Sequence, residues 1–281
     1  MKARSQDISG TRKAEILLVG NELLVGTTRD LNAYWLGGRL ALAGISVSRV
    51  TVVPDNVGVI ATVLREILSR QPDYVFSCGG IGPTFDDETL QGIASGLGRS
   101  LQLDATALAW IRERYELGYK AGRLQDKEMT PSRVKMAWIP GGSIPVPNSA
   151  GTAPAVKIVS GKTTIFVLPG VPRELQAIFT AEIAPGLRLE GGITFHQVRF
   201  KVDGVGESTM AKPVEGIMDG CDPRVWIKSH AKHDGTRYFV EVHVNGYGDH
   251  AMARSVGDVA GKVRATIELL GGEVKEIERR E

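Results

Sequence analysis

Short apolar runs that alternate with helical patterns constrain the fold of this chain more than any other feature of its sequence. The runs at 14–20 and 45–53 are rich in Ile, Leu and Val, the run at 73–80 carries Tyr, Val and Phe, and each run ends close to a glycine or a turn. Helical spacing of apolar residues follows the first two runs, over 32–44 and 56–70. Continuous apolar runs are typical of strands buried on both faces, and strands that alternate with helices form parallel sheets. We therefore predict an α/β fold built on a parallel sheet.

Beyond this alternation, the pattern changes to more helices and one hairpin. The sequence predicts two helices, over 87–97 and 104–118, followed by an irregular Gly- and Pro-rich stretch over 139–154. A β-hairpin over 155–170 and a last helix over 172–184 are predicted after it. The hairpin is expected to turn at Ser160 and Gly161, between two apolar segments. The last helix carries Pro172 near its start, where proline is well tolerated.

A glycine pair within residues 187–192 separates this pattern from a new one. We predict a larger domain over 14–188 and a smaller one over 189–281, preceded by a flexible tail over 1–13 without an identifiable targeting signal. In the smaller domain we predict a strand over 194–202, a helix over 207–218 and two strands over 224–229 and 237–246. A helix over 249–270 and a strand over 273–278 complete the predicted order. This order is the split βαβ arrangement of ferredoxin-like domains.

Composition excludes several classes of partner. The 281 residues carry a net charge of +2, and no cluster of basic residues suggests a nucleic-acid or membrane surface. The two cysteines, Cys78 and Cys221, lie far apart, and no apolar run has transmembrane length. We therefore expect a reduced, cytoplasmic protein that binds no membrane.

The stretch SCGGIGPTFDDETL, residues 77–90, is the first candidate for chemistry. Gly79, Gly80 and Gly82 would let main-chain N–H groups approach phosphate oxygens at the carboxyl end of a strand. Asp86 and Asp87 follow at the predicted start of a helix, where they could bind a metal. The alternative is that one aspartate caps the helix and the other complements its dipole.

Two further acidic residues are expected at the same edge of the sheet. Glu22 follows the first strand, and Asp55 with Asn56 follows the second. Together with Asp86 and Asp87 they could form an oxygen-rich site of the kind that Mg²⁺ prefers. For Asp55, ordinary turn chemistry is an equally good interpretation.

Two other motifs fail as catalytic signatures. The stretch SGKTT resembles a Walker A loop, but Val156 stands where its first glycine should be. The stretch PRELQAIF resembles a Nudix core, yet Ala177 and Ile178 replace its second pair of glutamates.

Histidines are the last candidates for a metal site. His230, His233 and His243 are interpreted as solvated or structural rather than zinc ligands, because no cysteine or carboxylate accompanies them at ligand spacing.

Five ordered motifs resemble the competence/damage-inducible protein A (CinA) family. They are GNELLVG, LNAYWLGGRLALAGISVSRVTVVPDN, GGIGPTFDDET, PNSAGTAPA and LPGVPRELQ, and the resemblance covers residues 14–185. It implies a three-layer α/β/α molybdopterin-binding-like domain of the MoaB and MogA type, with a KH-like or ferredoxin-like small domain. The nicotinamide-mononucleotide amidase domain of full bacterial members has no counterpart in this sequence, so deamidation is not expected.

The resemblance also implies site residues. The phosphate- or nucleotide-binding residues would be Gly79, Gly80, Gly82, Pro83, Thr84, Asn32, Asp55, Asn148, Gly151 and Thr152. Asp86 and Asp87 match a DDxT motif and would hold the metal, with Glu22 as a catalytic helper. Departures from the family pattern at Asn21 and at Asp30 border the expected crevice and leave the substrate preference open.

These residues lead to a hypothesis about function. Family members similar to this chain have been associated with metal-dependent hydrolysis of ADP-ribose, and the related domain of eukaryotic FAD synthases with hydrolysis of FAD. The resemblance therefore implies a nucleotide pyrophosphohydrolase that uses Mg²⁺ or Co²⁺, with K⁺ as a further ion to test. The alternatives are molybdopterin binding or adenylyl transfer to a pterin, and a non-catalytic nucleotide-binding module. The small domain carries nearly equal numbers of basic and acidic residues, so we do not expect it to bind nucleic acid. A homodimer or homotrimer is the expected assembly.

Overall fold

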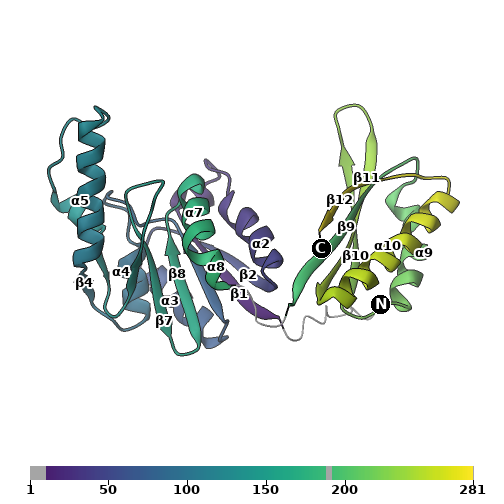
Figure 1. Cartoon of the computed structure of the whole chain (residues 1–281), viewed down its shortest axis with the longest axis horizontal. Helices are drawn as coiled ribbons and strands as arrows, with labels where there is room; N and C mark the ends of the chain where they lie inside the picture. The colour runs from purple at the N-terminus through teal and green to yellow at the C-terminus, as the bar shows by residue number, and fades with distance from the viewer. Residues whose placement is uncertain (1–10, 188–191, 281) are drawn as a thin grey trace. The chain divides into compact units, whose positions relative to one another are not determined.

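The computed structural model describes residues 11–187 and 192–280 of the chain (Figure 1). These residues divide into two compact units, one containing residues 12–39 and 46–187 and the other containing residues 192–280. The domain boundary predicted between residues 188 and 189 lies outside the described residues.

A six-stranded mixed sheet forms the centre of the larger unit, in the order β2-β1-β3-β8-β7-β6. Strand β3 lies parallel to both β1 and β8, whereas β7 runs antiparallel to β8 and to β6. The strands are β1 Arg12–Val19, β2 Ile45–Val53, β3 Tyr74–Cys78, β6 Ile144–Val146, β7 Ala155–Ser160 and β8 Thr163–Leu168. The predicted hairpin is therefore an antiparallel addition to a parallel core.

Two predictions on this unit were wrong in detail. Strand β1 begins at Arg12, so the tail predicted over 1–13 extends two residues too far, while residues 1–10 lie outside the described part. The stretch predicted to be irregular contains β6 and most of β5, Trp138–Pro140, which pairs with β4, Leu101–Leu103. Strands this short are defined by pairing with distant segments, so local composition does not reveal them.

Polar side chains fix the starts of several helices in this unit. Asn56 Oδ1 accepts a hydrogen bond from Val59 N at the start of α3, and Asp104 Oδ1 accepts one from Ala107 N at the start of α5. The helices are α1 Asn21–Leu24, α2 Asn32–Leu42, α3 Val57–Ser69, α4 Thr89–Gly96, α5 Ala105–Lys120, α6 Pro131–Lys135, α7 Pro172–Ile178 and α8 Ala184–Leu187. A π-helical turn η1, Phe179–Ile183, joins α7 to α8 within the helix predicted over 172–184.

Helices cover both faces of the sheet. On one face Leu17 and Val19 of β1 belong to a buried cluster with residues of α3, α4 and α5. On the other face the Phe76 and Phe166 rings stack with centroids 5.5 Å apart, and the Phe179 ring of η1 lies 6.1 Å from Phe76. The α2 side chain of Trp35 packs edge-on against Phe179, so α2 and η1 lie on this second face (Figure 1). The predicted three-layer α/β/α arrangement is confirmed.

The smaller unit is a four-stranded antiparallel sheet with two helices. Its order β10-β11-β9-β12 with the chain order βαββαβ is the ferredoxin-like topology, which decides against the KH-like alternative. The elements are β9 Thr194–Asp203, α9 Glu207–Asp219, β10 Val225–His233, β11 Tyr238–Gly248, α10 His250–Leu269 and β12 Glu273–Arg280. Helices α9 and α10 bury the apolar face of the sheet (Figure 1).

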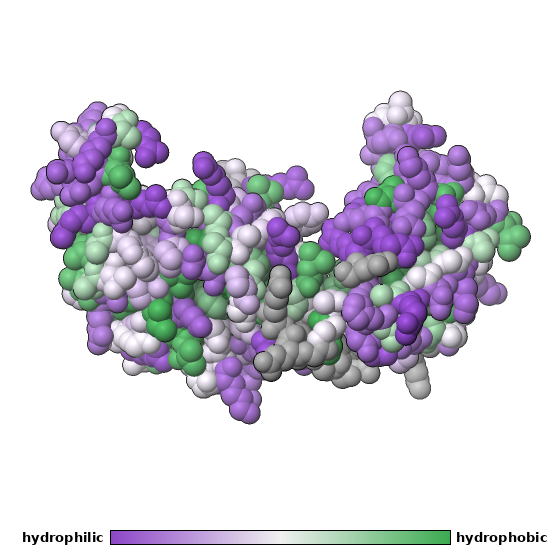
Figure 2. All heavy atoms as spheres, in the orientation of Figure 1, coloured by the Kyte–Doolittle hydropathy of each residue, from purple (hydrophilic) through white to green (hydrophobic). Residues whose placement is uncertain are grey.

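Charged and polar side chains occupy much of the other face of the small sheet, next to a cluster of Phe195, Trp226 and Tyr247. Arg199 on β9 forms ion pairs with Glu241 on β11 and with Glu278 on β12. The His230 and His243 rings lie 5.0 Å apart, and His243 Nε2 lies 3.3 Å from Glu241 Oε2. The β10–β11 hairpin is mostly hydrophilic on the face that Figure 2 shows.

Candidate functional site

Four loops at the carboxyl ends of β1, β2, β3 and β8 surround a cavity of about 540 Å³, as expected at this edge of an α/β sheet. Residues 151–153, together with Tyr115 of α5 and Met136, complete its wall. We call it the carboxylate cavity. The predicted site residues that line it are Glu22, Asp55, Gly79, Gly80, Gly82, Pro83, Thr84, Asp86, Asp87, Gly151 and Thr152.

The glycine loop, residues 79–84, offers unpaired N–H groups to this cavity. Among the described residues, the N–H groups of Gly80, Ile81 and Gly82 donate to no protein acceptor. Gly80 has φ +65°, and a Cβ there would lie 2.3 Å from Thr89 Oγ1, so only glycine fits. Successive free N–H groups are typical of anion-binding loops.

Gly79 contributes to packing rather than to this row of donors. Its N–H donates to Leu168 O at 3.0 Å, and a Cβ at Gly79 would lie 2.2 Å from Val19 O. We therefore assign Gly79 to the close approach of β1, β3 and β8, and no longer expect it to donate to a phosphate.

Asp87 shapes the loop instead of capping a helix. Its Oδ2 accepts hydrogen bonds from Thr84 N, at 2.8 Å, and from the Thr84 hydroxyl. On the far side, Lys135 Nζ donates to Thr84 O at 2.6 Å. Helix α4 begins only at Thr89, and the residue at its N-cap makes no side-chain cap hydrogen bond. The prediction that one of the two aspartates caps this helix is therefore wrong.

The remaining predicted carboxylates form few hydrogen bonds or ion pairs with other residues. Among the described residues, Asp86 and Glu22 have no side-chain hydrogen-bond or ion-pair partner, although Glu22 packs closely against Gly20. Asp55 Oδ2 accepts from Asn21 N at 2.8 Å, and Asp55 Oδ1 lies over Gly80. Asp55 therefore joins the loops after β1 and β2 while its other oxygen faces the glycine loop.

Two predicted binding residues lie behind the cavity wall. Asn32 is buried and donates from Nδ2 to Gly170 O at 2.7 Å, so it positions the loop after β8. Asn148 is also buried; its Oδ1 accepts from Ala150 N and Gly151 N and shapes the loop there. Both residues hold lining segments in place, and neither side chain lines the cavity.

Sequence reasoning missed several lining residues, and Glu174, Tyr115 and Met136 contribute the largest side chains with polar or polarisable groups among them. Glu174 on α7 adds a fifth carboxylate and accepts a hydrogen bond from Asn148 Nδ2 at 2.7 Å. It lies within the LPGVPRELQ motif, so the motif itself was the signal that could have identified it. Tyr115 and Met136 lie in segments whose local pattern gives no such signal.

The ionisable side chains of the carboxylate cavity are acidic. Among the described residues, its lining includes five carboxylates and no Lys, Arg or His; the carboxylates are Glu22, Asp55, Asp86, Asp87 and Glu174. Hard oxygen donors suit Mg²⁺ and similar cations. Within residues 11–187 and 192–280, no three acidic, His or Cys side chains are grouped closely enough to hold a metal by themselves. Mg²⁺ usually binds through one or two carboxylates plus substrate phosphates, so the donor set fits an ion that arrives with a phosphate ligand.

The fold and this cavity together define a molybdopterin-binding-type α/β/α domain with a ferredoxin-like appendage. A family model described as a probable molybdopterin binding domain matches residues 15–189. The chain belongs to that family.

Relatives and one solved structure extend this likeness. A protein of Metallosphaera sedula is 37% identical over 268 residues, which span 94% of this chain and 98% of that protein. Protein PH0439 of Pyrococcus horikoshii is 35% identical over 249 residues, 89% of this chain and 95% of that protein. The crystal structure of CinA from Thermoplasma acidophilum, a protein described as of unknown function, matches with 38% identity and a TM-score of 0.57. That match covers 63% of this chain and all of that one, and the predicted resemblance to CinA is confirmed.

No helix within the described residues is both long and apolar enough to cross a bilayer.

Proposed function

We propose that this protein is a divalent-metal-dependent pyrophosphohydrolase that cleaves the diphosphate of a nucleotide conjugate of the ADP-ribose or FAD type and releases AMP. The observation that carries the proposal is the pairing of free N–H donors with a cavity wall that bears five carboxylates and, among the described residues, no cationic side chain.

This pairing requires a cation. At an effective dielectric constant of 20, two like charges 4 Å apart repel by about 4 kcal/mol, so a diphosphate entering alone would meet several such penalties. Asp86 and Asp87 would hold a divalent ion, with Glu22 and Glu174 on the same cavity wall, and its charge would offset that repulsion. Mg²⁺ or Co²⁺ fits the oxygen donors, and K⁺ is a further ion to test. The chemistry such an ion supplies is neutralisation of phosphate charge and a lowered pKa of a coordinated water.

The chain's own groups account for the remaining steps. The N–H groups of Gly80, Ile81 and Gly82 would stabilise the negative charge that develops on the attacked phosphoryl group, and such donors are typically worth about 3 to 4 kcal/mol each. Water attacks one phosphorus, the bridging P–O bond breaks, and the water proton passes to a carboxylate. Glu22 is the better base, because Asp86 and Asp87 would already hold the ion and the Glu22 carboxylate has no hydrogen-bond or ion-pair partner among the described residues.

A turnover assay tests this function. Purified protein is incubated with ADP-ribose, FAD or ATP and with Mg²⁺ or Co²⁺, with and without K⁺, and AMP is separated by chromatography. We expect AMP from ADP-ribose or FAD, with a loss of at least 100-fold in Asp86→Asn. A matched control is Glu66→Gln, since Glu66 is an exposed carboxylate on α3 outside the cavity. Absence of AMP from both conjugates with a folded protein would refute the proposal.

A second candidate is molybdopterin binding with adenylyl transfer, which the family match favours. The same donors would serve if a pterin phosphate or alcohol replaced water as the acceptor and pyrophosphate left from ATP. Release of pyrophosphate from ATP only when a pterin is present would support this candidate. Nucleotide binding without any turnover would instead indicate a non-catalytic module.

A further inference from the structure

A second hollow of about 450 Å³ lies beside the carboxylate cavity. We call it the ring pocket, and its lining residues are Gly80, Ile81, Gly82, Phe85, Asp87, Glu88, Leu90, Gln91, Leu101, Pro131, Lys135, Met136 and Trp138. Five of these residues also line the carboxylate cavity, namely Gly80, Ile81, Gly82, Asp87 and Met136. The two hollows therefore share the glycine loop as a common wall.

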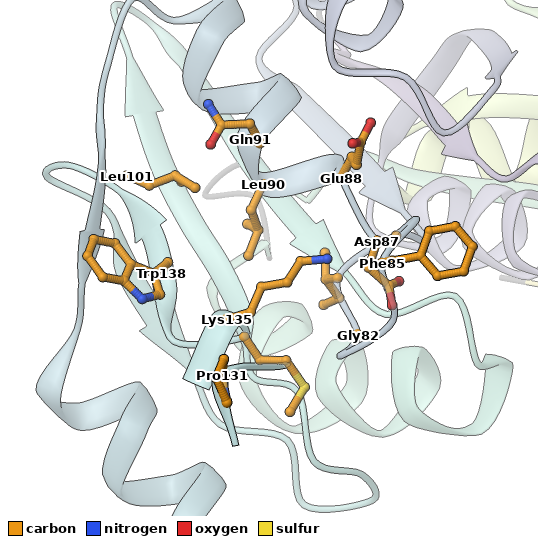
Figure 3. Close-up of a pocket in the computed structure, with 13 residues that line it drawn as sticks. Gly82, Phe85, Asp87, Glu88, Leu90, Gln91, Leu101, Pro131, Lys135 and Trp138 are labelled. Carbon is orange, nitrogen blue, oxygen red and sulfur yellow. The ribbon is translucent and has the colours of Figure 1, made fainter. Parts of the chain in front are cut away.

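The walls of the ring pocket differ in character from those of its neighbour. Leu90, Leu101, Met136 and Trp138 supply apolar and aromatic surface. Trp138 and Phe85 lie on opposite sides of the pocket, and the Lys135 side chain extends between them toward the glycine loop (Figure 3).

Two aromatic side chains are unusually accessible here. Phe85, at the tip of the segment after the glycine loop, is 92% exposed, and Trp138 is 42% exposed. Exposed aromatic rings on either side of a hollow offer flat surfaces on which a planar ring can stack.

Polar groups at the rim suit a nitrogen heterocycle. Gln91 is exposed at the first turn of α4 and carries both a donor and an acceptor. Lys135 Nζ, which donates to Thr84 O, adds a cation that the carboxylate cavity lacks among the described residues.

We propose that the ring pocket binds the planar heterocyclic base of the nucleotide whose phosphates occupy the carboxylate cavity. The shared wall carries the argument, because the free N–H groups of residues 80 to 82 lie in the loop that separates the two hollows. A base stacked on Trp138 would place its attached phosphates at this loop. This inference rests on the proposed function, and it makes the base a determinant of substrate choice.

Binding measurements on three probes test the assignment. Dissociation constants are measured by titration calorimetry for ADP with Mg²⁺, for pyrophosphate with Mg²⁺ and for adenosine alone, using wild type, Trp138→Leu and Phe85→Ser. We expect Trp138→Leu to weaken ADP and adenosine at least tenfold while it changes pyrophosphate less than twofold. Trp110→Leu is the matched control, because Trp110 lies in neither hollow.

The outcomes separate this inference from the proposed function. ADP and adenosine affinities that are unchanged in both Trp138→Leu and Phe85→Ser would overturn the assignment, as would a wild type that binds pyrophosphate but neither base-containing probe. Riboflavin is titrated in parallel, because the pocket could prefer a ring system larger than adenine. In that case the affinity for riboflavin should fall in Trp138→Leu. Binding of adenosine or riboflavin that depends on Trp138, in a protein that hydrolyses nothing, would uphold the ring pocket while the hydrolase proposal fails.

Discussion

Asn148 donates a hydrogen bond from Nδ2 to Glu174 Oε2 at 2.7 Å, and this contact joins the loop after β6 to helix α7 across the edge of the carboxylate cavity. The same amide donates to Ala153 O at 2.9 Å, and its Oδ1 accepts from Gly151 N at 2.8 Å. One buried side chain therefore fixes both the loop that lines the cavity and one of its carboxylates.

Replacing the Asn148 side chain should lower kcat/KM strongly and the free energy of unfolding only moderately. In Asn148→Ala the Glu174 carboxylate loses its donor and the loop loses its anchor, so we expect kcat/KM to fall at least tenfold. Stability should fall by about 1 to 3 kcal/mol, the usual cost of buried hydrogen-bonding groups left without partners. Steady-state kinetics and chemical denaturation measure the two effects. Ser149→Ala, an exposed change in the same loop, serves as the control, and an equal loss there would remove the special role of Asn148.

Adding a methyl group at Gly151 should disturb the same contact. A Cβ at this position would lie 1.9 Å from Glu174 Oε2, so in Gly151→Ala the Glu174 carboxylate has to move and gives up its hydrogen bond from Asn148. We expect a melting temperature several degrees lower, with about 0.5 to 1.5 kcal/mol lost together with this hydrogen bond. In the Glu174→Ala background the added methyl group meets no carboxylate, so the second substitution should cost less than about 0.5 kcal/mol. Additive losses in the double variant would contradict this geometry.

The two cysteines should differ sharply in reactivity. Cys78 at the end of β3 is 2% exposed, and burial raises the pKa of its thiol far above the ordinary value. Cys221 in the small unit is partly exposed. With iodoacetamide at pH 8, mass spectrometry of the native protein should find modification at Cys221, while Cys78 reacts only after denaturant is added. Equal labelling rates would mean that the end of β3 opens readily.

Acid should weaken the small unit through its ion-paired glutamates. Burial opposes ionisation of Glu241, but hydrogen bonds from Arg199 and His243 outweigh it and lower the pKa of Glu241. Burial also opposes ionisation of Glu278, and hydrogen bonds from Arg280 and Arg199 lower its pKa in the same way.

A carboxyl group whose pKa is lower in the folded state stabilises the fold above its unfolded pKa of about 4.3, and this contribution is lost as the pH falls through the folded value. Hydrogen exchange of β9, β11 and β12 should therefore accelerate as the pH is lowered below about 4, after correction for the intrinsic exchange rate. In Arg199→Met this acid dependence should become shallower, and an unchanged dependence would count against the ion pairs.

Much of the fold was predictable because it depends on local patterns. The apolar run that became β1 is continuous, β2 and β3 are rich in β-branched or aromatic residues, and Asn56 caps α3 next to a clear helical pattern. Strands β4 and β5 were missed because each has three residues and exists only through pairing with the other. The ferredoxin-like order of the small sheet followed from the order of its elements.

The site was predictable as a set of loops, but the roles of individual residues were not. The glycine loop and Asp86 face the cavity as the motif suggested, because strand ends in a parallel sheet share one edge. Asn32 and Asn148 also lie in motifs of the family, yet the Asn32 side chain bonds a backbone carbonyl, and the Asn148 side chain bonds backbone groups and the Glu174 carboxylate instead of lining the cavity. A motif shows that a residue is needed in the region, whereas only the packing shows whether its side chain faces the ligand or supports a residue that does.

The dependence of pyrophosphate binding on a divalent ion tests the central claim most directly. Titration calorimetry is run with pyrophosphate in EDTA and in excess Mg²⁺, on wild type, Asp86→Asn and the control Glu66→Gln. If the acidic wall requires a metal, pyrophosphate should not bind measurably in EDTA. With Mg²⁺ it should bind clearly to wild type and to the control, and at least tenfold more weakly to Asp86→Asn. Pyrophosphate binding of equal strength with and without Mg²⁺ would contradict a cavity whose acidic wall requires a metal.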